Sequence, residues 1–209
     1  MAERIECRVG RTGLPGDLTV PDEATGLVIF AHGSGSSRRS GRNRHVAERL
    51  NDDGFATLLF DLLTENEADD RRNVFDIPLL GLRVVEAVQT VGERDSVAAL
   101  PVGLFGASTG AAAALIAAAR LPQRIAAVVS RGGRPDLAAD VLPRVRAPTL
   151  LIVGGADEPV IAMNEAAFAK LDCVKALEIV PGATHFFEEE GALDTVVTLA
   201  ARWFRTYLG

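Results

Sequence analysis

The 209-residue sequence is short of the residue types that mark several protein classes. Its two cysteines, Cys7 and Cys173, are too few for a disulfide framework, and they do not have the spacing of a metal site. With 22 basic and 28 acidic residues, the net charge of −6 gives no sign of a nucleic-acid or anionic-membrane partner. These shortages exclude a disulfide-stapled scaffold and indicate free thiols in a reducing compartment.

Long apolar runs are also missing. The longest one, residues 111–119, is too short to span a bilayer, which takes about 20 residues. The first positions carry charges at Glu3, Arg4 and Glu6 and lack the apolar core of a secretory signal. We therefore expect a cytoplasmic protein with no membrane partner.

Short apolar runs alternate with segments of helical spacing, which predicts an α/β fold with a mostly parallel central sheet and helices on both faces. The expected strands are residues 27–31, 57–62, 102–105, 126–130, 149–153 and 176–180, after an edge hairpin of 5–9 and 17–20. Helices are expected over residues 77–91, 111–119 and 193–207. Because no repeat or linker interrupts this pattern, we expect a single domain over residues 1–209.

A candidate nucleophile follows the strand expected at 102–105. Residues 106–110 read Gly-Ala-Ser-Thr-Gly, and an alanine-rich helix comes next. A strand, a G-x-S-x-G motif and a helix together are typical of a nucleophile elbow, in which a strained serine stands free at a sharp turn. The alternative is a glycine-rich turn capped by Ser108 or Thr109. The preceding strand favours Ser108 as a nucleophile.

Two further loops offer partners for Ser108. His185 lies at the carboxyl end of the strand expected at 176–180, which favours a general base over a structural histidine. Asp157, the candidate acid of a triad, follows the strand at 149–153. It could instead cap a helix that begins at Glu158, and Glu158 is the alternative candidate for the acid. The chain order Ser108, Asp157, His185 is that of α/β-hydrolases and favours a triad of these three residues.

A loop of small residues, His32-Gly33-Ser34-Gly35-Ser36-Ser37, follows the strand at 27–31. Acyl transfer in such a fold needs a backbone N–H from this loop beside the amide of the residue after the nucleophile. We therefore predict an oxyanion hole made by the Thr109 and Ser34 amides, with Gly33 as the alternative to Ser34. A plain strand-to-helix turn would not need so many small residues.

Five arginines stand near the expected site: Arg38, Arg39, Arg42, Arg44 and Arg131. Each one alone is most simply a solvated side chain. As a group at the mouth of the site, they could hold a carboxylate or phosphate of the substrate, and Arg39 and Arg131 are our candidates for this role. Phe186, next to His185, is a candidate lining of an acyl pocket or a core residue.

These motifs make the sequence similar to the dienelactone-hydrolase-type members of the α/β-hydrolase superfamily. The resemblance covers residues 26–208 and rests on the motifs at 31–35, 106–110, 154–157 and 182–185. More narrowly, the sequence resembles hydrolases that sometimes occur fused to a phosphoribosyltransferase domain, and we expect no such second domain within these residues. Dienelactone hydrolases have a cysteine nucleophile and a glutamate near the oxyanion loop. Ser108 and the stretch 34–39 stand in these places here, which implies ester hydrolysis in general rather than dienelactone cleavage.

We therefore expect a serine hydrolase of small soluble esters, thioesters or lactones that forms an acyl-enzyme on Ser108 and needs no metal or organic cofactor. Lid insertions in this superfamily usually follow the strand at 126–130, and residues 133–147 leave room for one short helix, so we expect no lid domain. An acyltransferase or perhydrolase with the same triad, and a binding protein that retains only the fold, stay open as alternatives. The expected partner is a small acyl substrate, and the expected state is a monomer or homodimer.

Overall fold

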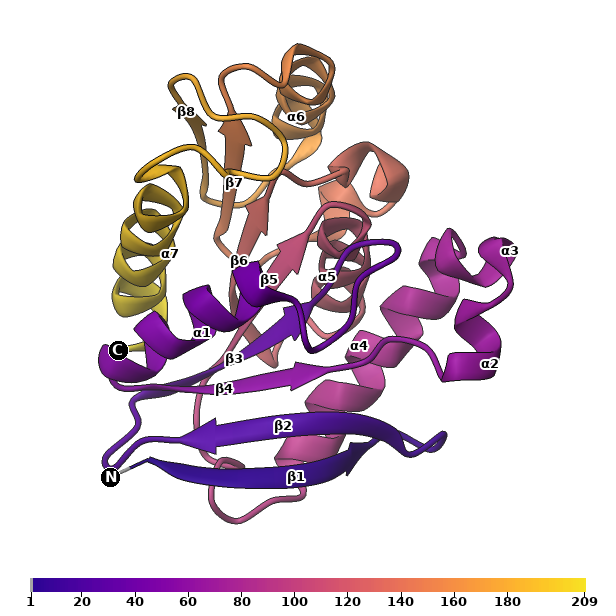
Figure 1. The fold of residues 1–209 in the computed structure, drawn as a ribbon, viewed down its shortest axis with the longest axis vertical. Helices are drawn as coiled ribbons and strands as arrows, with labels where there is room; N and C mark the ends of the chain where they lie inside the picture. Colours follow the sequence, from indigo (N-terminus) through magenta and orange to yellow (C-terminus); the bar gives the residue numbers. More distant parts are fainter. Residues whose placement is uncertain (1) are drawn as a thin grey trace.

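The computed structural model describes residues 2–209, so residue 1 of the expected domain lies outside the described part. Eight strands form one sheet in the order β1-β2-β4-β3-β5-β6-β7-β8 (Figure 1). The pairs β1–β2 and β2–β4 are antiparallel, and all pairs from β4 to β8 are parallel. The strands are Glu3–Val9 (β1), Leu14–Val20 (β2), Gly26–Ala31 (β3), Phe55–Phe60 (β4), Val102–Ala107 (β5), Ile125–Arg131 (β6), Thr149–Gly154 (β7) and Lys175–Val180 (β8).

The expected mostly parallel sheet is confirmed. Every residue of β3, β4, β5 and β7 is buried, which explains why these strands read as continuous apolar runs rather than as alternating patterns. Most strand boundaries differ from the expected ones by one to three residues, and two strands show why. β4 begins and ends two residues before the expected 57–62, and β2 begins at Leu14 because Pro15 and Gly16 pair with β1 instead of forming a turn.

Helices cover both faces of the sheet (Figure 1). α1 and α7 pack on one face, and α4, α5 and α6 pack on the other, each group with its own hydrophobic cluster. The helices are Gly41–Asp52 (α1), Glu65–Ala68 (α2), Arg71–Val74 (α3), Ile77–Gly92 (α4), Thr109–Arg120 (α5), Glu158–Lys170 (α6) and Ala192–Leu208 (α7). None of the helices within residues 2–209 has both the length and the apolar character to cross a membrane.

The connections at the carboxyl ends of the strands shape the site. The segment after β6 contains two 3-10 turns, Pro135–Ala138 and Leu142–Arg144, so no lid domain is inserted there. The short helices α2 and α3 lie between β4 and α4, and periodicity did not predict them because four residues are too few to show a helical repeat. Since the carboxyl ends of parallel strands share one edge, the loops that carry the candidate residues meet at that edge.

Candidate active site

Ser108 occupies the sharp turn between β5 and α5, with φ of 50° and ψ of −122°. A positive φ is strained for a residue with a Cβ, so the surroundings must hold the turn. The Ser108 amide donates to the Arg131 carbonyl at 3.3 Å, and its carbonyl accepts from the Ala111 and Arg134 amides at 3.1 and 3.0 Å. The Ser108 side chain makes no helix-capping hydrogen bond, and its Oγ is therefore available for chemistry.

The two glycines of the motif are required by close backbone approaches. A Cβ on Gly106 would lie 2.4 Å from the Ala111 Cα, and one on Gly110 would lie 2.1 Å from the Ala31 carbonyl oxygen. Contacts this short do not occur for real side chains, so both positions need glycine. The first turn of α5 is thereby pressed against β5 and β3, which fixes where Ser108 stands.

The structure joins the candidate base and acid. His185 Nδ1 and Asp157 Oδ2 lie 2.7 Å apart, and both side chains are largely buried. Asp157 stands at the N-cap position of α6, but its carboxylate makes no capping hydrogen bond there. Glu158, the rival acid, is exposed at the first position of α6. The Asp157 carboxylate thus orients the imidazole instead of capping the helix.

The end of β6 connects this pair with Ser108. The backbone carbonyl of Arg131 accepts a hydrogen bond from the Ser108 amide. The next residue, Gly132, has φ of 51°. A Cβ on Gly132 would lie 3.0 Å from the His185 carbonyl oxygen and 3.6 Å from His185 Nδ1. Gly132 was not among the predicted site residues, although the Gly132-Gly133 pair after a buried strand was a signal for a close approach.

Two phenylalanines follow His185 and have different places. Phe186 is 49% exposed, and its ring centroid lies 5.2 Å from that of His185. Phe187 is buried and has φ of 56°, a second strained backbone within two residues of the candidate base. Phe186 therefore lies at the surface beside the imidazole, while Phe187 anchors the loop in the core.

The predicted oxyanion loop lies against the elbow. A Cβ on Gly33 would meet Ser108 Cβ at 3.0 Å and Ser108 Oγ at 3.7 Å. The Ser34 amide donates to Thr109 Oγ1 at 2.9 Å, whereas the Thr109 amide makes no hydrogen bond to another part of residues 2–209. The Thr109 hydroxyl contact was not predicted, because nothing local in the sequence relates positions 34 and 109.

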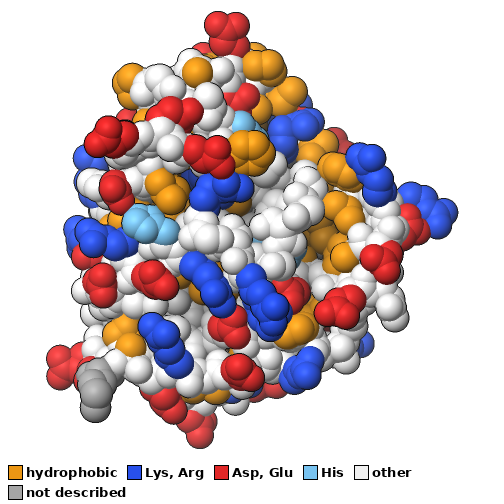
Figure 2. All heavy atoms as spheres, viewed as in Figure 1, with side chains coloured by type: hydrophobic (Ala, Val, Ile, Leu, Met, Phe, Trp, Pro, Cys, Tyr) orange, Lys and Arg blue, Asp and Glu red, His pale blue; other side chains and the backbone are white. Residues whose placement is uncertain are grey.

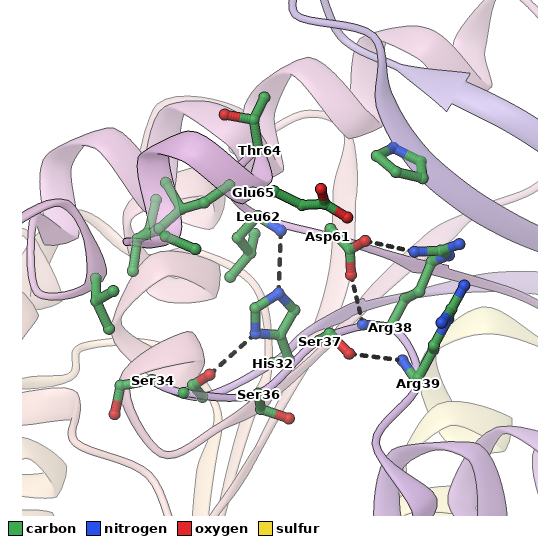
Figure 3. Close-up of a pocket in the computed structure, with 17 residues that line it drawn as sticks. His32, Ser34, Ser36, Ser37, Arg38, Arg39, Asp61, Leu62, Thr64 and Glu65 are labelled. Carbon is green, nitrogen blue, oxygen red and sulfur yellow. Dashed lines mark hydrogen bonds and ion pairs between the residues drawn. The ribbon is translucent and has the colours of Figure 1, made fainter. Parts of the chain in front are cut away.

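His32, at the start of this loop, is a buried structural residue. Its Nδ1 lies 2.9 Å from the Gly33 carbonyl oxygen, and its Nε2 accepts the Leu62 amide at 3.0 Å (Figure 3). Both ring nitrogens are used when Nδ1 carries the proton, so the ring clamps the loop to the end of β4. Burial lowers the pKa of His32, which keeps it neutral.

A cavity of about 470 Å³ opens beside Gly33, between the loop at 32–39 and the helices α2 to α4. Its wall combines hydroxyl groups with apolar side chains, among them Ser34, Thr64, Leu62 and Leu80. Figure 3 shows the charged part of the lining, where Arg38 is engaged with Asp61. The cavity is thus next to Ser108 through Gly33 and offers both apolar and polar contacts to a small molecule.

The five candidate arginines separate into different environments. Basic side chains gather around the middle of the face seen in Figure 2. Arg38 pairs with Asp61 and Asp17, and Arg44 pairs with Asp17. Arg39 lines the cavity, is exposed and makes no ion pair within residues 2–209.

Arg42 and Arg131 lie near the His185 loop instead. Arg42 pairs with Glu188 at 2.8 Å and lies over the Phe186 ring, 4.7 Å from its centroid. Arg131 is buried, with 6% exposure. No three His, Cys, Asp or Glu side chains within the described residues come together as a metal site would require.

Comparison with protein families gives one match over most of the chain. A model described as the dienelactone hydrolase family matches residues 14–206. Proteins of two Mycobacterium tuberculosis strains, which bear a provisional phosphoribosyl transferase name, are 54% identical over 206 residues. The match covers 99% of this chain and 46% of each relative, so the chain spans about half the length of the curated relatives that it matches.

Solved structures extend the likeness. The crystal structure of a dienelactone hydrolase from Anabaena variabilis is 54% identical, with a TM-score of 0.96 and coverage of 100% of this chain and 99% of that one. Est1E from Butyrivibrio proteoclasticus is 17% identical, with a TM-score of 0.77 and coverage of 96% and 98%. A dienelactone hydrolase-like promiscuous phosphotriesterase from metagenomic libraries is also 17% identical, with a TM-score of 0.76 and coverage of 100% and 99%. The last two show the same fold.

Proposed function

Since this chain belongs to the dienelactone hydrolase family of the α/β-hydrolase superfamily, we propose that it is a serine hydrolase that cleaves small soluble esters, thioesters or lactones. The observation that carries the proposal is the strained Ser108 elbow, connected through Arg131 and Gly132 to a His185–Asp157 pair at 2.7 Å. A positive φ at a serine between a strand and a helix is strain that persists only where the surroundings enforce it. Such strain is common at reacting groups.

The proposed reaction begins with proton transfer from Ser108 Oγ to His185 Nε2 while Oγ attacks the acyl carbonyl. Asp157 holds the proton on His185 Nδ1, which fixes the tautomer, and stabilises the imidazolium that forms. The imidazolium then protonates the leaving alcohol or thiol. Water, activated by the same imidazole, releases the acid from the acyl-enzyme and restores Ser108.

The oxyanion would be held by backbone amides. The Thr109 amide stands at the first turn of α5, where the helix dipole adds a partial positive charge. We assign the second donor to the Ser34 amide, which gives up its hydrogen bond to Thr109 Oγ1 as the tetrahedral oxygen forms. Gly33 permits this approach because a side chain there would press on Ser108.

The cavity beside Gly33 is the proposed substrate site. Its volume of about 470 Å³ is in the range of small-molecule sites and suits a short acyl or alcohol group better than a lipid aggregate. The Arg39 side chain lines this cavity and makes no ion pair within residues 2–209, and Phe186 lies beside the imidazole. Both are assigned to substrate contact.

The test is covalent labelling with a fluorophosphonate, read by intact and peptide mass. We expect one adduct on Ser108, no adduct in Ser108→Ala, and turnover of p-nitrophenyl acetate that is lost in the same variant. The absence of an adduct on folded wild-type protein would refute an activated serine. Faster consumption of the ester on addition of an alcohol or peroxide would indicate acyl transfer instead of hydrolysis.

A further inference from the structure

Asn164, in the middle of α6, is an amide that lies wholly inside the protein. It has no exposed surface, and it shares the inner face of the helix with the apolar Val160 and Ala167. Its Nδ2 donates to the Gly133 carbonyl at 3.0 Å and to the Val160 carbonyl at 2.8 Å. Its Oδ1 is buried without a hydrogen-bond partner in residues 2–209. A half-satisfied amide costs free energy that an apolar side chain of similar size would avoid, so packing alone does not account for Asn164.

The Gly133 carbonyl belongs to the segment 131–134, which holds the nucleophile elbow through two hydrogen bonds. The Arg131 carbonyl accepts the Ser108 amide at 3.3 Å, and the Arg134 amide donates to the Ser108 carbonyl at 3.0 Å. The hydrogen bond from α6 reaches the carbonyl that lies between these two contacts. A displacement of Gly133 would therefore disturb the backbone that keeps Ser108 at its positive φ.

The same segment also contacts the candidate base. Gly132 lies against His185, since a Cβ there would lie 3.0 Å from the His185 carbonyl oxygen and 3.6 Å from its Nδ1. At Gly133, a Cβ would overlap the Ser130 hydroxyl and lie 2.7 Å from the Ala111 Cβ. The segment is therefore packed between β6, α5 and the histidine loop, and it cannot shift unless one of them moves.

Asp157, the acid of the proposed triad, is carried by the same helix as Asn164. Its carbonyl accepts the Val160 amide at 3.0 Å, so the carboxylate moves with the first turn of α6. Asn164 comes about two turns later, and its Nδ2 joins this first turn to the segment 131–134. The hydrogen bond of 2.7 Å between His185 Nδ1 and Asp157 Oδ2 therefore depends on how α6 is placed against that segment.

We propose that Asn164 is a positioning residue of the triad: its amide fixes α6, and with it the Asp157 carboxylate, against the segment 131–134. Because this segment holds Ser108 and contacts His185, one side chain sets the placement of all three groups. The inference rests on the proposed function, since it concerns the same reaction. The hydrogen bonds of Asn164 go to backbone carbonyls, so it acts only through these neighbours. Catalytic geometry is sensitive to such support, because a displacement of about 1 Å can cost about 100-fold in rate.

Asn164→Leu removes the amide and keeps a side chain of similar size. We expect kcat for p-nitrophenyl acetate to fall by about 10- to 100-fold, fluorophosphonate labelling of Ser108 to slow by a similar factor, and KM to stay within about twofold.

Asn51→Leu is the matched control. Asn51 also donates its amide to a backbone carbonyl, that of Phe55 at 2.9 Å, but it lies at the end of α1 that leads into β4. Its replacement should leave kcat within about twofold of wild type. A wild-type kcat in Asn164→Leu, or an equal fall in both variants, would overturn the proposal.

A second variant gives a readout that a purely structural role would not move. The carboxyl group of Asn164→Asp has the shape of the amide, and it can donate to a backbone carbonyl only while it is protonated. Once ionised, it repels both carbonyl oxygens that the amide binds. Burial raises the pKa of such a carboxyl group, so this loss comes at a higher pH than is usual for aspartate.

The dependence of kcat/KM on pH should therefore change shape. In wild type, kcat/KM should rise as His185 loses its proton and then stay level. In Asn164→Asp, it should fall again at higher pH. Ala166→Asp adds the same charge to the exposed side of α6 and should keep the wild-type profile. A profile of Asn164→Asp parallel to that of wild type would overturn the positioning role.

Histidine tautomers measured in Ser108→Ala separate this inference from the proposed function, because no turnover is needed. The chain has three histidines, so the ¹H–¹⁵N signals of the His185 ring can be assigned by substitution. We expect the proton on Nδ1 in Ser108→Ala and a mixture of tautomers when Asn164→Leu is added. An unchanged tautomer would overturn the proposal. A changed tautomer, in a protein whose wild-type Ser108 takes no fluorophosphonate label, would refute the serine hydrolase and leave the positioning role standing.

Discussion

Replacing Gly33 with alanine should damage catalysis much more than folding. The new Cβ would lie 3.0 Å from Ser108 Cβ, 3.2 Å from the Ala107 carbonyl oxygen and 3.7 Å from Ser108 Oγ. Gly33 does not have a positive φ, so alanine can adopt its backbone conformation without strain. The contacts at 3.0 and 3.2 Å are relieved when the loop moves away from the elbow by a few tenths of an ångström.

That movement would displace the proposed second oxyanion donor, Ser34. Complete loss of one such donor lowers kcat by about 100- to 1,000-fold, so a partial displacement should lower it by about 10- to 100-fold. Overpacking at one position typically lowers the free energy of unfolding by about 1–3 kcal/mol, and we expect Gly33→Ala to be at the lower end because the loop is at the surface. The assays are p-nitrophenyl acetate turnover, the rate of fluorophosphonate labelling and urea unfolding.

Gly41→Ala is the control for this prediction. Gly41 begins α1, eight positions along the same connection, and a Cβ there meets no atom within 4 Å. Alanine should therefore leave kcat unchanged and stabilise the helix by a few tenths of a kcal/mol or more. If kcat of Gly33→Ala stayed within twofold of wild type, the loop would not contribute a donor to the transition state.

Three further predictions concern single substitutions at Asp157, His32 and Arg83. Asp157→Asn should lower kcat by about 10⁴-fold, because the carboxylate no longer holds the proton on His185 Nδ1. Glu158→Gln should leave kcat unchanged. A similar loss of kcat in both variants would argue against Asp157 as the acid of the triad. Burial lowers the pKa of His32 below its usual 6.5, so the unfolded chain binds a proton there more readily than the folded one. The free energy of unfolding should therefore fall as pH drops below 6.5, by at most about 1.4 kcal/mol per pH unit. Urea unfolding of His32→Gln should show a weaker dependence on pH. Arg83→Leu should lower the free energy of unfolding by about 3 kcal/mol, because the buried Arg83 pairs with Glu67 at 2.8 Å. A loss below about 1 kcal/mol in urea unfolding would show that water replaces Arg83 as the partner of the Glu67 carboxylate.

The fold was accessible from the sequence because its central strands β3, β4, β5 and β7 are buried on both faces. Short apolar runs such as 149–153, rich in β-branched and leucine side chains and bounded by turn residues, favour interior strands. The elbow was accessible because its motif needs glycine at 106 and 110, where a Cβ would lie as close as 2.1 Å to neighbouring backbone. Both signals can be read within a few consecutive residues, although the contact that requires Gly110 is with the distant Ala31.

The environment of each arginine was not accessible in this way. Arg38 and Arg131 both follow apolar strands, yet one pairs with Asp61 and the other lies buried without a counter-charge. The difference depends on the side chains that the rest of the chain places around each guanidinium, Asp61 and Asp17 for Arg38 and Asn43 for Arg131. Such contacts join positions far apart in the chain, as the Ser34–Thr109 hydrogen bond also does, and no local pattern encodes them.

The two non-glycine residues with positive φ at the site, Ser108 and Phe187, have a consequence for how this protein changes over generations. Glycine at either position would relax the backbone, because it adopts such conformations freely. Selection for heat resistance alone would therefore favour substitutions that remove the nucleophile or loosen the histidine loop. A laboratory lineage evolved for thermostability should keep activity only where turnover is screened in every round.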